Sequence, residues 1–504
     1  MLQSGRASLR ERVIAMSGET NQEHTYLIGL DIGTSAVKGV LMSAKGSITS
    51  REKSETAYQR IDGGGVQFDV RQLYRLTVGV IRRLAGALPR GGSIVGLSIA
   101  SASGNTVLVD EQGEPMIPAF SWMDQRVRDE MKTVFGKLNP DEVHETTGWP
   151  LLESFPLAHL AWLKCHAPKL LETSSIICMS TDYLHFKLTG NWGIDCSTAT
   201  TFYLQDQKSA QWHSPYLQKL GIPESKLPPI RSTGDRIGRI TSEASADMGL
   251  ARGTPVVLGA FDHPCAARGS GILDEGQLLI SCGTSWVGFM PIKDRYRSVA
   301  LRMLTDPFLQ PAGPWGAMFS LPAIASSVDA YIRKYISDGP DRYREFDRLA
   351  VSAGPGAGGL IIDPSTEENS DDLAQAEKAD IARAIMEGTV FLLKEKIDKL
   401  EVDGTCFSSV TLVGGPSETF PWPQIVADVL GLDIRTVNGS CAGAVGAAMV
   451  AGIGVGLYAD EQDAQKQLVF PELIRKPDPS TATIYETRYR QFLNKYTTLG
   501  SDAK

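Results

Sequence analysis

The sequence lacks the patterns that mark disulfide frameworks, zinc sites and membrane spans. Its seven cysteines are an odd number, and no two of them are spaced as a Cys-x-x-Cys pair. This usage is typical of a reducing cytoplasm. The seven histidines form no metal-ligand pattern either. No run approaches the ~20 strongly apolar residues of a transmembrane helix, and the Gly/Ala-rich stretch 441–457 is interpreted as a close-packed helix. We therefore expect a cytoplasmic protein without disulfides or structural zinc.

Positive charge is also scarce. The 504 residues carry 50 Lys and Arg against 58 Asp and Glu, a formal net charge of -8. This balance argues against a general nucleic-acid binder or a binder of anionic membranes. Residues 1–25 are polar and hold no apolar core segment, so no secretory signal is expected. The length exceeds that of a usual single core, which predicts two domains or more.

What the sequence does contain is a pair of similar glycine turns. Residues 26–42 (YLIGLDIGTSAVKGVLM) predict a strand, a turn at Gly33, Thr34 and Ser35, and a second strand that carries Lys38. A second copy lies at 278–290 (LLISCGTSWVGFM), with Gly283, Thr284 and Ser285 in its turn. Two such hairpins, roughly 250 residues apart, suggest two related domains that face one anionic ligand.

Glycine turns of this kind suit phosphate binding. Glycine lets backbone N–H groups approach phosphate oxygens closely, and Thr and Ser hydroxyls add donors. A single copy would be interpreted as an ordinary hairpin turn, but two copies that each follow an apolar strand favour a nucleotide site, and we expect ATP. Neither turn is a P-loop, because no GxxxxGK[ST] precedes a helix, and the glycines lack the dinucleotide-binding spacing.

The remaining chain alternates strands and helices, which is an α/β pattern. Buried-type strands are expected at 93–100 and at 255–261, and the second of these leads directly to Asp262. A domain boundary is expected near Gly271–Asp274. Helices are expected at Arg126–Phe135, Leu157–His166, Asp182–Leu188, Ala323–Tyr335, Tyr343–Ala350, Ile381–Leu400, Trp422–Leu430, Ala442–Val450 and in an amphipathic segment after Ser480.

Several motifs carry a family resemblance. DIGTSAVK at 31–38, GTS at 283–285 and VGGPSE at 413–418 resemble the phosphate-1, phosphate-2 and adenosine motifs of the actin-like ATPase superfamily. With WMDQR at 122–126 and GAFDHPCAARGSG at 259–271, the chain resembles an FGGY-family carbohydrate kinase. The motifs keep the family order over roughly 25–470, and the layout is most similar to xylulose kinases.

The resemblance implies an architecture. It predicts two actin-like, ribonuclease H-like α/β domains, each with a mixed sheet and flanking helices, and a cleft between them. A disordered tail is expected at 1–24. An N-terminal domain for sugar binding and catalysis is expected at 25–272, a C-terminal nucleotide-binding domain at 273–490, and a tail at 491–504. The oligomeric state stays open, with a homodimer as one option.

The resemblance also implies roles for individual residues. Asp262 matches the catalytic aspartate, although Asp is also a common helix N-cap. Asp31 would hold Mg²⁺ through water, or would only fix its turn. The nucleotide is expected at Gly33, Thr34, Ser35, Lys38, Gly283, Thr284, Ser285, Gly358, Gly359, Gly414, Gly415, Pro416 and Ser417. The sugar is expected at Ser103, Gly104, Asn105, Trp122, Asp124, Arg126 and Asp262.

Some of these assignments have plain structural alternatives. Lys38 is equally well explained as a solvated strand lysine, and 414–417 as a strand-to-helix turn. Residues 122–126 fit a helix N-terminus with an ion pair. Two departures also matter. Xylulose kinases carry Gln-Met-His-Gly where this chain has residues 102–105, and the usual Gly-Glu-Arg loop is replaced by an acidic stretch at 365–375.

The activity predicted from these features is ATP-dependent phosphorylation of a small sugar, a ketopentose or a related ketose or polyol. ATP and Mg²⁺ are the expected cofactors, and neither nucleic acid nor a membrane is an expected partner. Two alternatives keep the fold: a sugar-binding regulator without turnover, and another actin-like ATPase such as a chaperone or filament protein. A dinucleotide oxidoreductase is disfavoured because no GxGxxG follows a strand.

Overall fold

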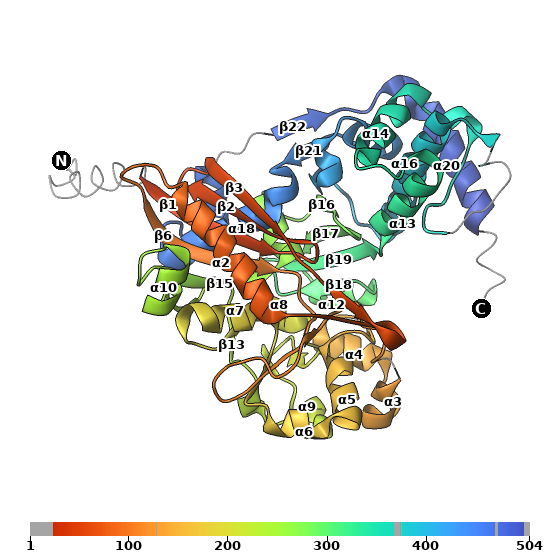
Figure 1. Ribbon diagram of the computed structural model, residues 1–504. Helices are drawn as coiled ribbons and strands as arrows, with labels where there is room; N and C mark the ends of the chain where they lie inside the picture. The colour runs from red at the N-terminus through yellow and green to blue at the C-terminus, as the bar shows by residue number, and fades with distance from the viewer. Residues whose placement is uncertain (1–23, 128, 367–372, 374, 469–471, 498–504) are drawn as a thin grey trace, which may run out of the picture. The chain divides into compact units, whose positions relative to one another are not determined.

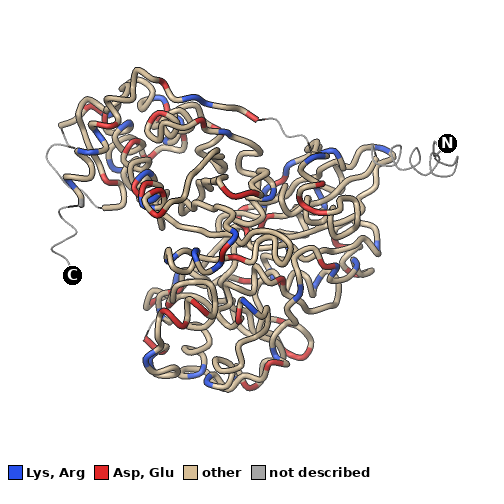
Figure 2. The backbone as a smooth tube through the Cα atoms, turned by 180° about the vertical axis from the view of Figure 1, so that it is seen from behind, with Lys and Arg blue, Asp and Glu red and all other residues tan. Residues whose placement is uncertain are grey.

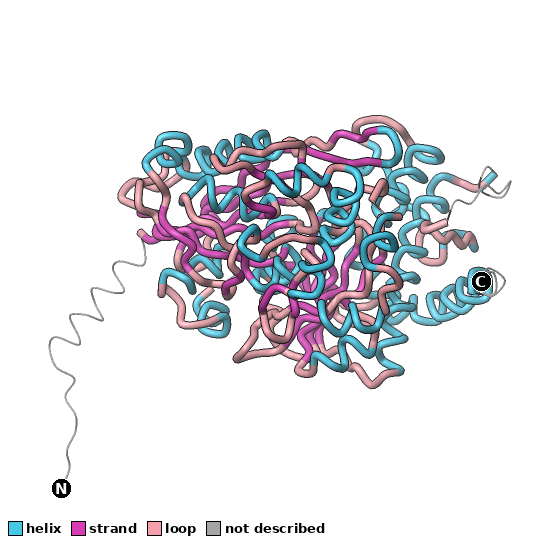
Figure 3. Tube along the Cα trace, turned by 90° about the horizontal axis from the view of Figure 1, so that it is seen from below, coloured by secondary structure: helices cyan, strands magenta, loops and turns pink. Residues whose placement is uncertain are grey.

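The structure is a computed structural model that describes residues 24–127, 129–366, 373, 375–468 and 472–497. Residues 1–23 of the tail expected at 1–24, and most of the acidic stretch at 365–375, lie outside these residues. The described chain contains many helices and many strands (Figure 3), and they are intermixed along the sequence, so the α/β class is confirmed. The chain forms two compact units. Unit 1 comprises 1–273, 294–315 and 443–470, and unit 2 comprises 274–293, 316–442 and 471–504.

Unit 1 is built on a six-stranded mixed sheet with the strand order β14-β15-β6-β1-β2-β3 (Figure 1). β1 pairs in parallel with β6, and β6 in parallel with β15, while the other pairs are antiparallel. The first predicted hairpin is therefore the β1–β2 pair at the centre of this sheet. The strands are β1 (Thr25–Ile32), β2 (Ala36–Ser43), β3 (Ile48–Glu55), β6 (Ser93–Ser101), β14 (Arg236–Arg239) and β15 (Pro255–Phe261).

Helices cover both faces of this sheet. α2 (Val70–Gly86) starts at its predicted cap, Asp69, whose carboxylate accepts a hydrogen bond from the Arg71 backbone N–H at 2.8 Å. Side chains of α2 pack over Gly39 of β2. On the other face α18 (Ala442–Val455) approaches β1 so closely that a Cβ atom on Gly29 would lie 1.8 Å from the Ala444 carbonyl oxygen. The Gly/Ala-rich stretch is thus a helix packed backbone to backbone.

The other elements of unit 1 extend from the sheet edges and connections. Its short strands are β4 (Gln59–Ile61), β5 (Gly65–Phe68), β7 (Val107–Val109), β8 (Ala119–Phe120), β9 (Ile176–Cys178), β10 (Ile194–Asp195), β11 (Gln205–Asp206), β12 (Gln211–Trp212), β13 (Ile230–Arg231) and β18 (Leu304–Asp306). Its other helices are α3 (Glu130–Phe135), α4 (Pro140–Thr147), α5 (Pro156–His166), α6 (Pro168–Thr173), α7 (Ser180–Thr189), α8 (Cys196–Thr200), α9 (Ser214–Leu220), α10 (Ser242–Met248), α11 (Asp262–Gly269), α12 (Arg295–Ala300) and α19 (Glu461–Gln467).

Unit 2 repeats the hairpin within a second mixed sheet, in which strands follow the order β19-β17-β16-β20-β21-β22. β16 pairs antiparallel with β17 and parallel with β20. The strands are β16 (Gln277–Cys282), β17 (Trp286–Ile292), β19 (Trp315–Leu321), β20 (Ser409–Gly414), β21 (Ile434–Val437) and β22 (Glu472–Arg475). The helices are α13 (Ile324–Tyr331), α14 (Arg342–Ala353), α16 (Lys378–Val402), α17 (Pro421–Leu430) and α20 (Ala482–Thr497).

Two predicted helices differ from the structure. The helix predicted at Arg126–Phe135 begins only at Glu130. Residues 126 and 127 form a turn instead, because the buried Asp124 carboxylate accepts hydrogen bonds from both the backbone and the side chain of Arg126. The helix predicted at 323–335 is α-helical only from Ile324 to Tyr331, and a wider π-helical turn then runs through 332–336.

The distribution of charged residues and the lengths of the apolar helices match what the composition predicts. Basic and acidic residues are interspersed along both units in Figure 2. Among the described residues, no helix combines the length and the apolar character needed to span a bilayer.

Candidate active site

Asp262 lies where β15 ends and α11 begins. β15 is a buried strand inside the unit 1 sheet, between the edge strand β14 and β6, and ligands of α/β proteins commonly bind at the carboxyl ends of such strands. The helix N-cap is Phe261, so Asp262 is the first helical residue and does not take the capping role considered as its alternative. Its side chain is 24% exposed, and one carboxylate oxygen accepts a hydrogen bond from the His263 backbone N–H at 2.8 Å. The carboxylate is held in place yet remains accessible.

Asp31 lies two strands away in the same sheet and is electrostatically coupled to Asp262. Burial raises the pKa of Asp31 to about 7; Lys38 lowers this pKa, and the Asp262 carboxylate raises it further. Lys38 faces Asp31 directly in the β1–β2 register. The first turn of α18 closes over Asp31, because a Cβ atom on Gly443 would lie 2.9 Å from its Oδ2 atom. Two carboxylates and one ammonium group therefore share one region of unit 1.

These residues fit a Mg²⁺ ion with few protein ligands. Burial, and to a smaller extent repulsion from Asp262, raises the pKa of Asp31, and a cation near its carboxylate would offset both effects. No group of three or more His, Cys, Asp or Glu residues suited to a metal occurs among the described residues. Mg²⁺ commonly keeps several waters and takes one or two carboxylates together with substrate phosphates. The site is compatible with that mode of binding and does not offer a complete protein cage.

The first glycine turn is braced by its neighbours. The Gly33 N–H donates to the Ala36 carbonyl at 2.9 Å and closes the turn. Thr56 holds the turn from the side: its hydroxyl donates to the Thr34 carbonyl at 2.6 Å, and its N–H donates to the Ser35 carbonyl at 3.1 Å. Thr56 follows a polar edge strand, and nothing in the local sequence pattern pointed to this role.

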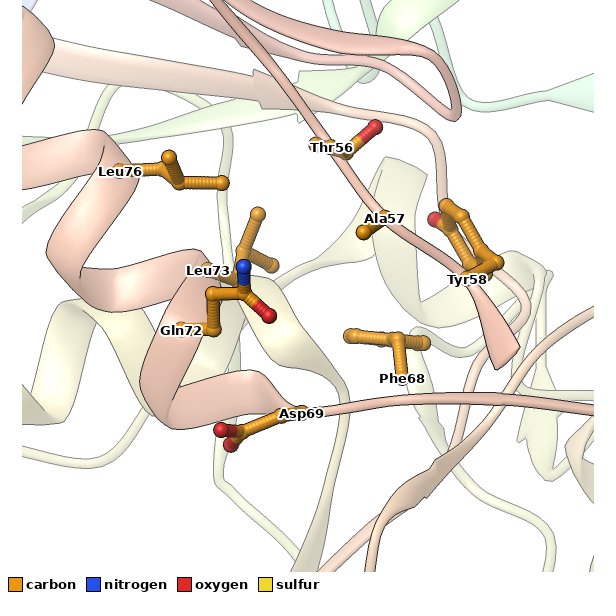
Figure 4. A pocket seen from close by; sticks show the side chains of 8 residues that line it. All are labelled: Thr56, Ala57, Tyr58, Phe68, Asp69, Gln72, Leu73 and Leu76. Carbon is orange, nitrogen blue, oxygen red and sulfur yellow. The ribbon is translucent and has the colours of Figure 1, made fainter.

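A shallow pocket lies beside Thr56 in unit 1. Figure 4 shows it between the first turns of α2 and the segment that follows β3, with Tyr58 and Phe68 along one side. Its cavity volume of about 10 Å³ is of the order needed for a single water molecule. This pocket is too small for a sugar or a nucleotide.

The predicted sugar residues 122–126 are only partly available to a ligand. The Trp122 indole N–H donates to the Thr34 hydroxyl at 3.3 Å, which joins this segment to the glycine turn. Asp124 is fully buried; it accepts from the Val66 N–H at 3.1 Å and forms an ion pair with Arg126 at 2.9 Å. The Arg126 guanidinium lies 4.6 Å from the centre of the Phe120 ring. Asp124 therefore serves as an internal brace, while Trp122 and Arg126 keep partly exposed surfaces.

Residues 103–105 are likewise engaged within the fold. The Asn105 side chain accepts from the Ser180 N–H at 2.7 Å and donates to the Ser180 hydroxyl at 3.1 Å, at the start of α7. The Ser103 hydroxyl donates to the Ser101 carbonyl at 3.1 Å. Gly104 has φ +80°, and a Cβ atom there would lie 2.5 Å from the Phe155 ring. Any contact of these residues with a sugar would come mainly from the backbone.

In unit 2 the second glycine turn and the predicted adenosine loop lie side by side. Cys282 and Gly414 are register partners at the ends of β16 and β20, and a Cβ atom on Gly414 would lie 2.5 Å from the Cys282 carbonyl oxygen. The Ser285 hydroxyl accepts from the Ala323 N–H at 3.0 Å, so it holds the connection to α13. Gly283 and Thr284 are exposed. The Ser417 hydroxyl donates back to the Gly414 carbonyl at 2.7 Å, while Gly415 and Pro416 complete that short turn.

The predicted glycines 358 and 359 lie against α16 and α20. A Cβ atom on Gly358 would lie 2.5 Å from a carboxylate oxygen of Asp380. The buried Glu387 carboxylate accepts from the Gly356 N–H at 2.9 Å and from Arg383 at 2.8 Å. The loop is therefore fixed by a buried ion pair on α16. Glycine is favoured at 358 by the close approach of Asp380 and at 359 by a φ of +101°.

Comparisons with known proteins agree with this architecture. Residues 26–269 match the N-terminal domain, and residues 343–455 the C-terminal domain, of the FGGY family of carbohydrate kinases. An autoinducer-2 kinase from Klebsiella pneumoniae is 27% identical over 95% of this chain and 94% of its own length. A xylulose kinase from Rhodospirillum rubrum has a TM-score of 0.81 at 24% identity, covering 94% and 99% of the two chains. A glycerol kinase from Plasmodium falciparum, solved with ADP, has a TM-score of 0.78 at 19% identity, covering 94% and 98%. These structures share the two-domain actin-like fold.

Proposed function

Because the chain belongs to the FGGY family of carbohydrate kinases, we propose that it transfers the γ-phosphoryl group of ATP to a hydroxyl group of a small sugar, a ketopentose or a related ketose or polyol. The observation that carries the proposal is the position of Asp262. It is an accessible carboxylate at the end of an interior strand, coupled to Asp31 and in the same sheet as the first glycine turn.

Phosphoryl transfer needs little covalent help from a protein. It needs in-line positioning, stabilisation of phosphate charge and an acceptor for the proton of the attacking hydroxyl. In this proposal the Asp262 carboxylate accepts that proton. The turn at 33–35 in unit 1 and the turn at 283–285 in unit 2 each supply N–H and hydroxyl donors for phosphate oxygens. Asp31 would hold Mg²⁺ through a water, and the ion, when bound, offsets phosphate charge.

The proposed sugar surface is the part of unit 1 next to the first turn. Trp122 offers an apolar platform for the C–H face of a sugar, and its indole is already joined to Thr34. Arg126 is oriented by Asp124 and by the Phe120 ring, so its guanidinium is pre-organised to donate to hydroxyls. The identity of the sugar depends on hydroxyl-sized differences in such contacts.

A coupled assay for ADP release tests the function directly. The purified protein is given Mg-ATP together with ketoses, polyols, aldonates and autoinducer-2, the last because it appears in the name of one relative. We expect one of these classes to raise ADP formation well above the rate with ATP alone. Sugar binding by calorimetry without ADP formation for any class would refute the kinase and favour the sugar-binding regulator.

Thr284→Val is expected to weaken nucleotide affinity more than sugar affinity. Thr284 is exposed in the second turn, and the change removes one hydroxyl donor while keeping the shape of the side chain. A hydrogen bond to a charged group contributes about 1.5–3 kcal/mol, which corresponds to a roughly tenfold or greater rise in the nucleotide Kd. Isothermal calorimetry with ADP and with the sugar measures both.

Ser408→Ala is the matched control for the second turn. Ser408 is an exposed hydroxyl at the opposite end of β20, where it donates to the Gly276 carbonyl at 3.1 Å. Both affinities should stay unchanged in this variant. A larger loss of sugar than of nucleotide affinity in Thr284→Val would show that the second turn has been assigned to the wrong ligand.

A further inference from the structure

The strand that leads to Asp262 is irregular just before it ends. The parallel ladder between β15 and β6 pairs Leu258 with Ile99, then shifts register before Phe261 pairs with Ser101. A Cβ atom on Gly259, inside this irregularity, would lie 2.0 Å from the Ile99 carbonyl oxygen. Irregularities of this kind re-aim the side chains that follow and are frequent beside active sites.

A buried hydroxyl group fixes the strand at this point. The Phe261 backbone N–H donates to the Ser197 hydroxyl at 3.2 Å, and that hydroxyl donates to the Asp306 Oδ2 atom at 2.6 Å. Ser197 lies in α8 and Asp306 ends β18, so three separate segments of unit 1 meet here. The chain of contacts ends one peptide unit before Asp262.

Asp306 is an unusual residue to find at this place. Its side chain has no solvent exposure, and its Oδ1 atom has no hydrogen-bond partner among the residues that the structure describes. Burial raises the pKa of Asp306 to about 7, while the Ser197 hydroxyl and the Arg268 guanidinium lower it. A buried carboxyl group with an unpaired oxygen costs stability. Its presence is better explained by a role at the site than by a contribution to folding.

The segment that contains Asp306 also contacts the C-terminal end of α11. The buried Arg268 side chain donates to the Phe308 carbonyl, and its guanidinium lies 4.6 Å from the centre of the Phe308 ring. Its Nε atom donates to Glu461 of α19 at 3.0 Å. Residues 306–308 therefore restrain the helix that begins with Asp262 near both of its ends, through Ser197 at one end and through Arg268 at the other.

We propose that Ser197 and Asp306 are positioning residues that set the direction of the Asp262 carboxylate toward the attacking hydroxyl. This inference rests on the proposed kinase function. The backbone at Phe261 determines where the first turn of α11 points, and Asp306 fixes the rotamer of Ser197 that accepts from it. A misplacement of about 1 Å at a reacting group can lower the rate about 10²-fold. The pair therefore contributes to kcat without touching either substrate.

Ser197→Ala tests the proposal. We expect kcat to fall about tenfold or more, with the KM values for sugar and ATP within about twofold of the wild type, since catalytic geometry is lost while substrate binding is not. The control is Ser298→Ala, which also removes a buried hydroxyl. Ser298 bonds to the Thr305 hydroxyl at 2.7 Å, next to Asp306 in the chain, whereas the Phe261 N–H donates to Ser197. Its kcat should be unchanged.

Asp306→Asn and Asp306→Ala give a second, independent comparison. The amide oxygen of Asn can still accept from the Ser197 hydroxyl, so Asp306→Asn should retain more kcat than Asp306→Ala. Thermal midpoints identify any loss that comes from unfolding. The proposal is overturned if Ser197→Ala keeps wild-type kcat, if Ser298→Ala loses as much, or if the loss falls on KM. A wild-type protein inactive with every sugar would instead refute the underlying kinase function.

Discussion

Asp262→Asn is expected to abolish sugar-dependent ADP formation while leaving nucleotide binding intact. The amide keeps the size of the side chain, and its oxygen can still accept from the His263 N–H, but it cannot take the proton of the sugar hydroxyl. General-base assistance typically contributes about 10²–10⁴-fold, so kcat should fall by that factor. The coupled ADP assay gives kcat, and calorimetry with ADP shows whether the nucleotide is still bound.

Asp247→Asn serves as the matched control for this change. Asp247 has an exposed carboxylate and lies in α10 of the same unit. Its backbone carbonyl oxygen accepts a hydrogen bond from Arg82, and the substitution leaves this bond in place. This variant should keep wild-type turnover. Near-normal turnover of Asp262→Asn would remove Asp262 from the mechanism, whatever the control shows.

Gly446→Ala is expected to destabilise unit 1 strongly. A Cβ atom at this position of α18 would lie 1.7 Å from the Cys265 carbonyl oxygen and 3.0 Å from the Gly269 N atom, both in the backbone of α11. Backbone atoms cannot turn aside as a side chain can, so α18 and α11 must separate. Overpacking in a core costs about 1–3 kcal/mol and occasionally more, and we expect the upper end of that range. Chemical denaturation measures the loss.

Gly86→Ala is the control for the effect of the methyl group itself. Gly86 is also helical, in the last turn of α2, and a Cβ atom there would meet nothing within 4 Å. Alanine is a better helix former than glycine by about 0.5–1 kcal/mol. Gly86→Ala should therefore be neutral or slightly stabilising. An equally stable Gly446→Ala would mean that α18 does not pack on α11 as closely as the structure shows.

Continuous apolar patterns in the sequence were enough to predict the two hairpins and the main helices. Both hairpins appear where the glycine turns predicted them, as β1–β2 and β16–β17. The helix expected at 381–400 is α16, and the one at 442–450 is the first part of α18. In each case the pattern lies within one continuous stretch, so local sequence carries the information.

Contacts between distant residues could not be predicted in this way. The helix expected from Arg126 fails because Asp124 is drawn to the Val66 backbone, 58 residues away in the chain. The Asn105 side chain is taken up by Ser180, 75 residues away. In both places a polar residue interpreted as a ligand contact has an internal partner, and only the folded chain shows it.

The predicted site is clearer at the backbone than at the side chains. Glycine turns can be recognised in the sequence, and the structure explains why several positions need glycine, such as Gly414, which lies close to the Cys282 backbone. The roles of Asp31, Lys38 and Asp262 toward ATP, Mg²⁺ and sugar stay predictions. Their mutual electrostatic coupling is what the folded chain adds to the sequence pattern.

The return of late segments to unit 1 limits how the chain can be divided. Residues 294–315 and 443–470 belong to the unit that holds the first hairpin. A gene fragment that stops at residue 272 would encode β1 with no α18 to cover Gly29, and α11 without the residues at 306–308 that restrain it. Such a fragment should expose an apolar sheet face and aggregate. Recombination between related genes would therefore exchange unit 1 intact only if its three separate stretches, 1–273, 294–315 and 443–470, were exchanged together.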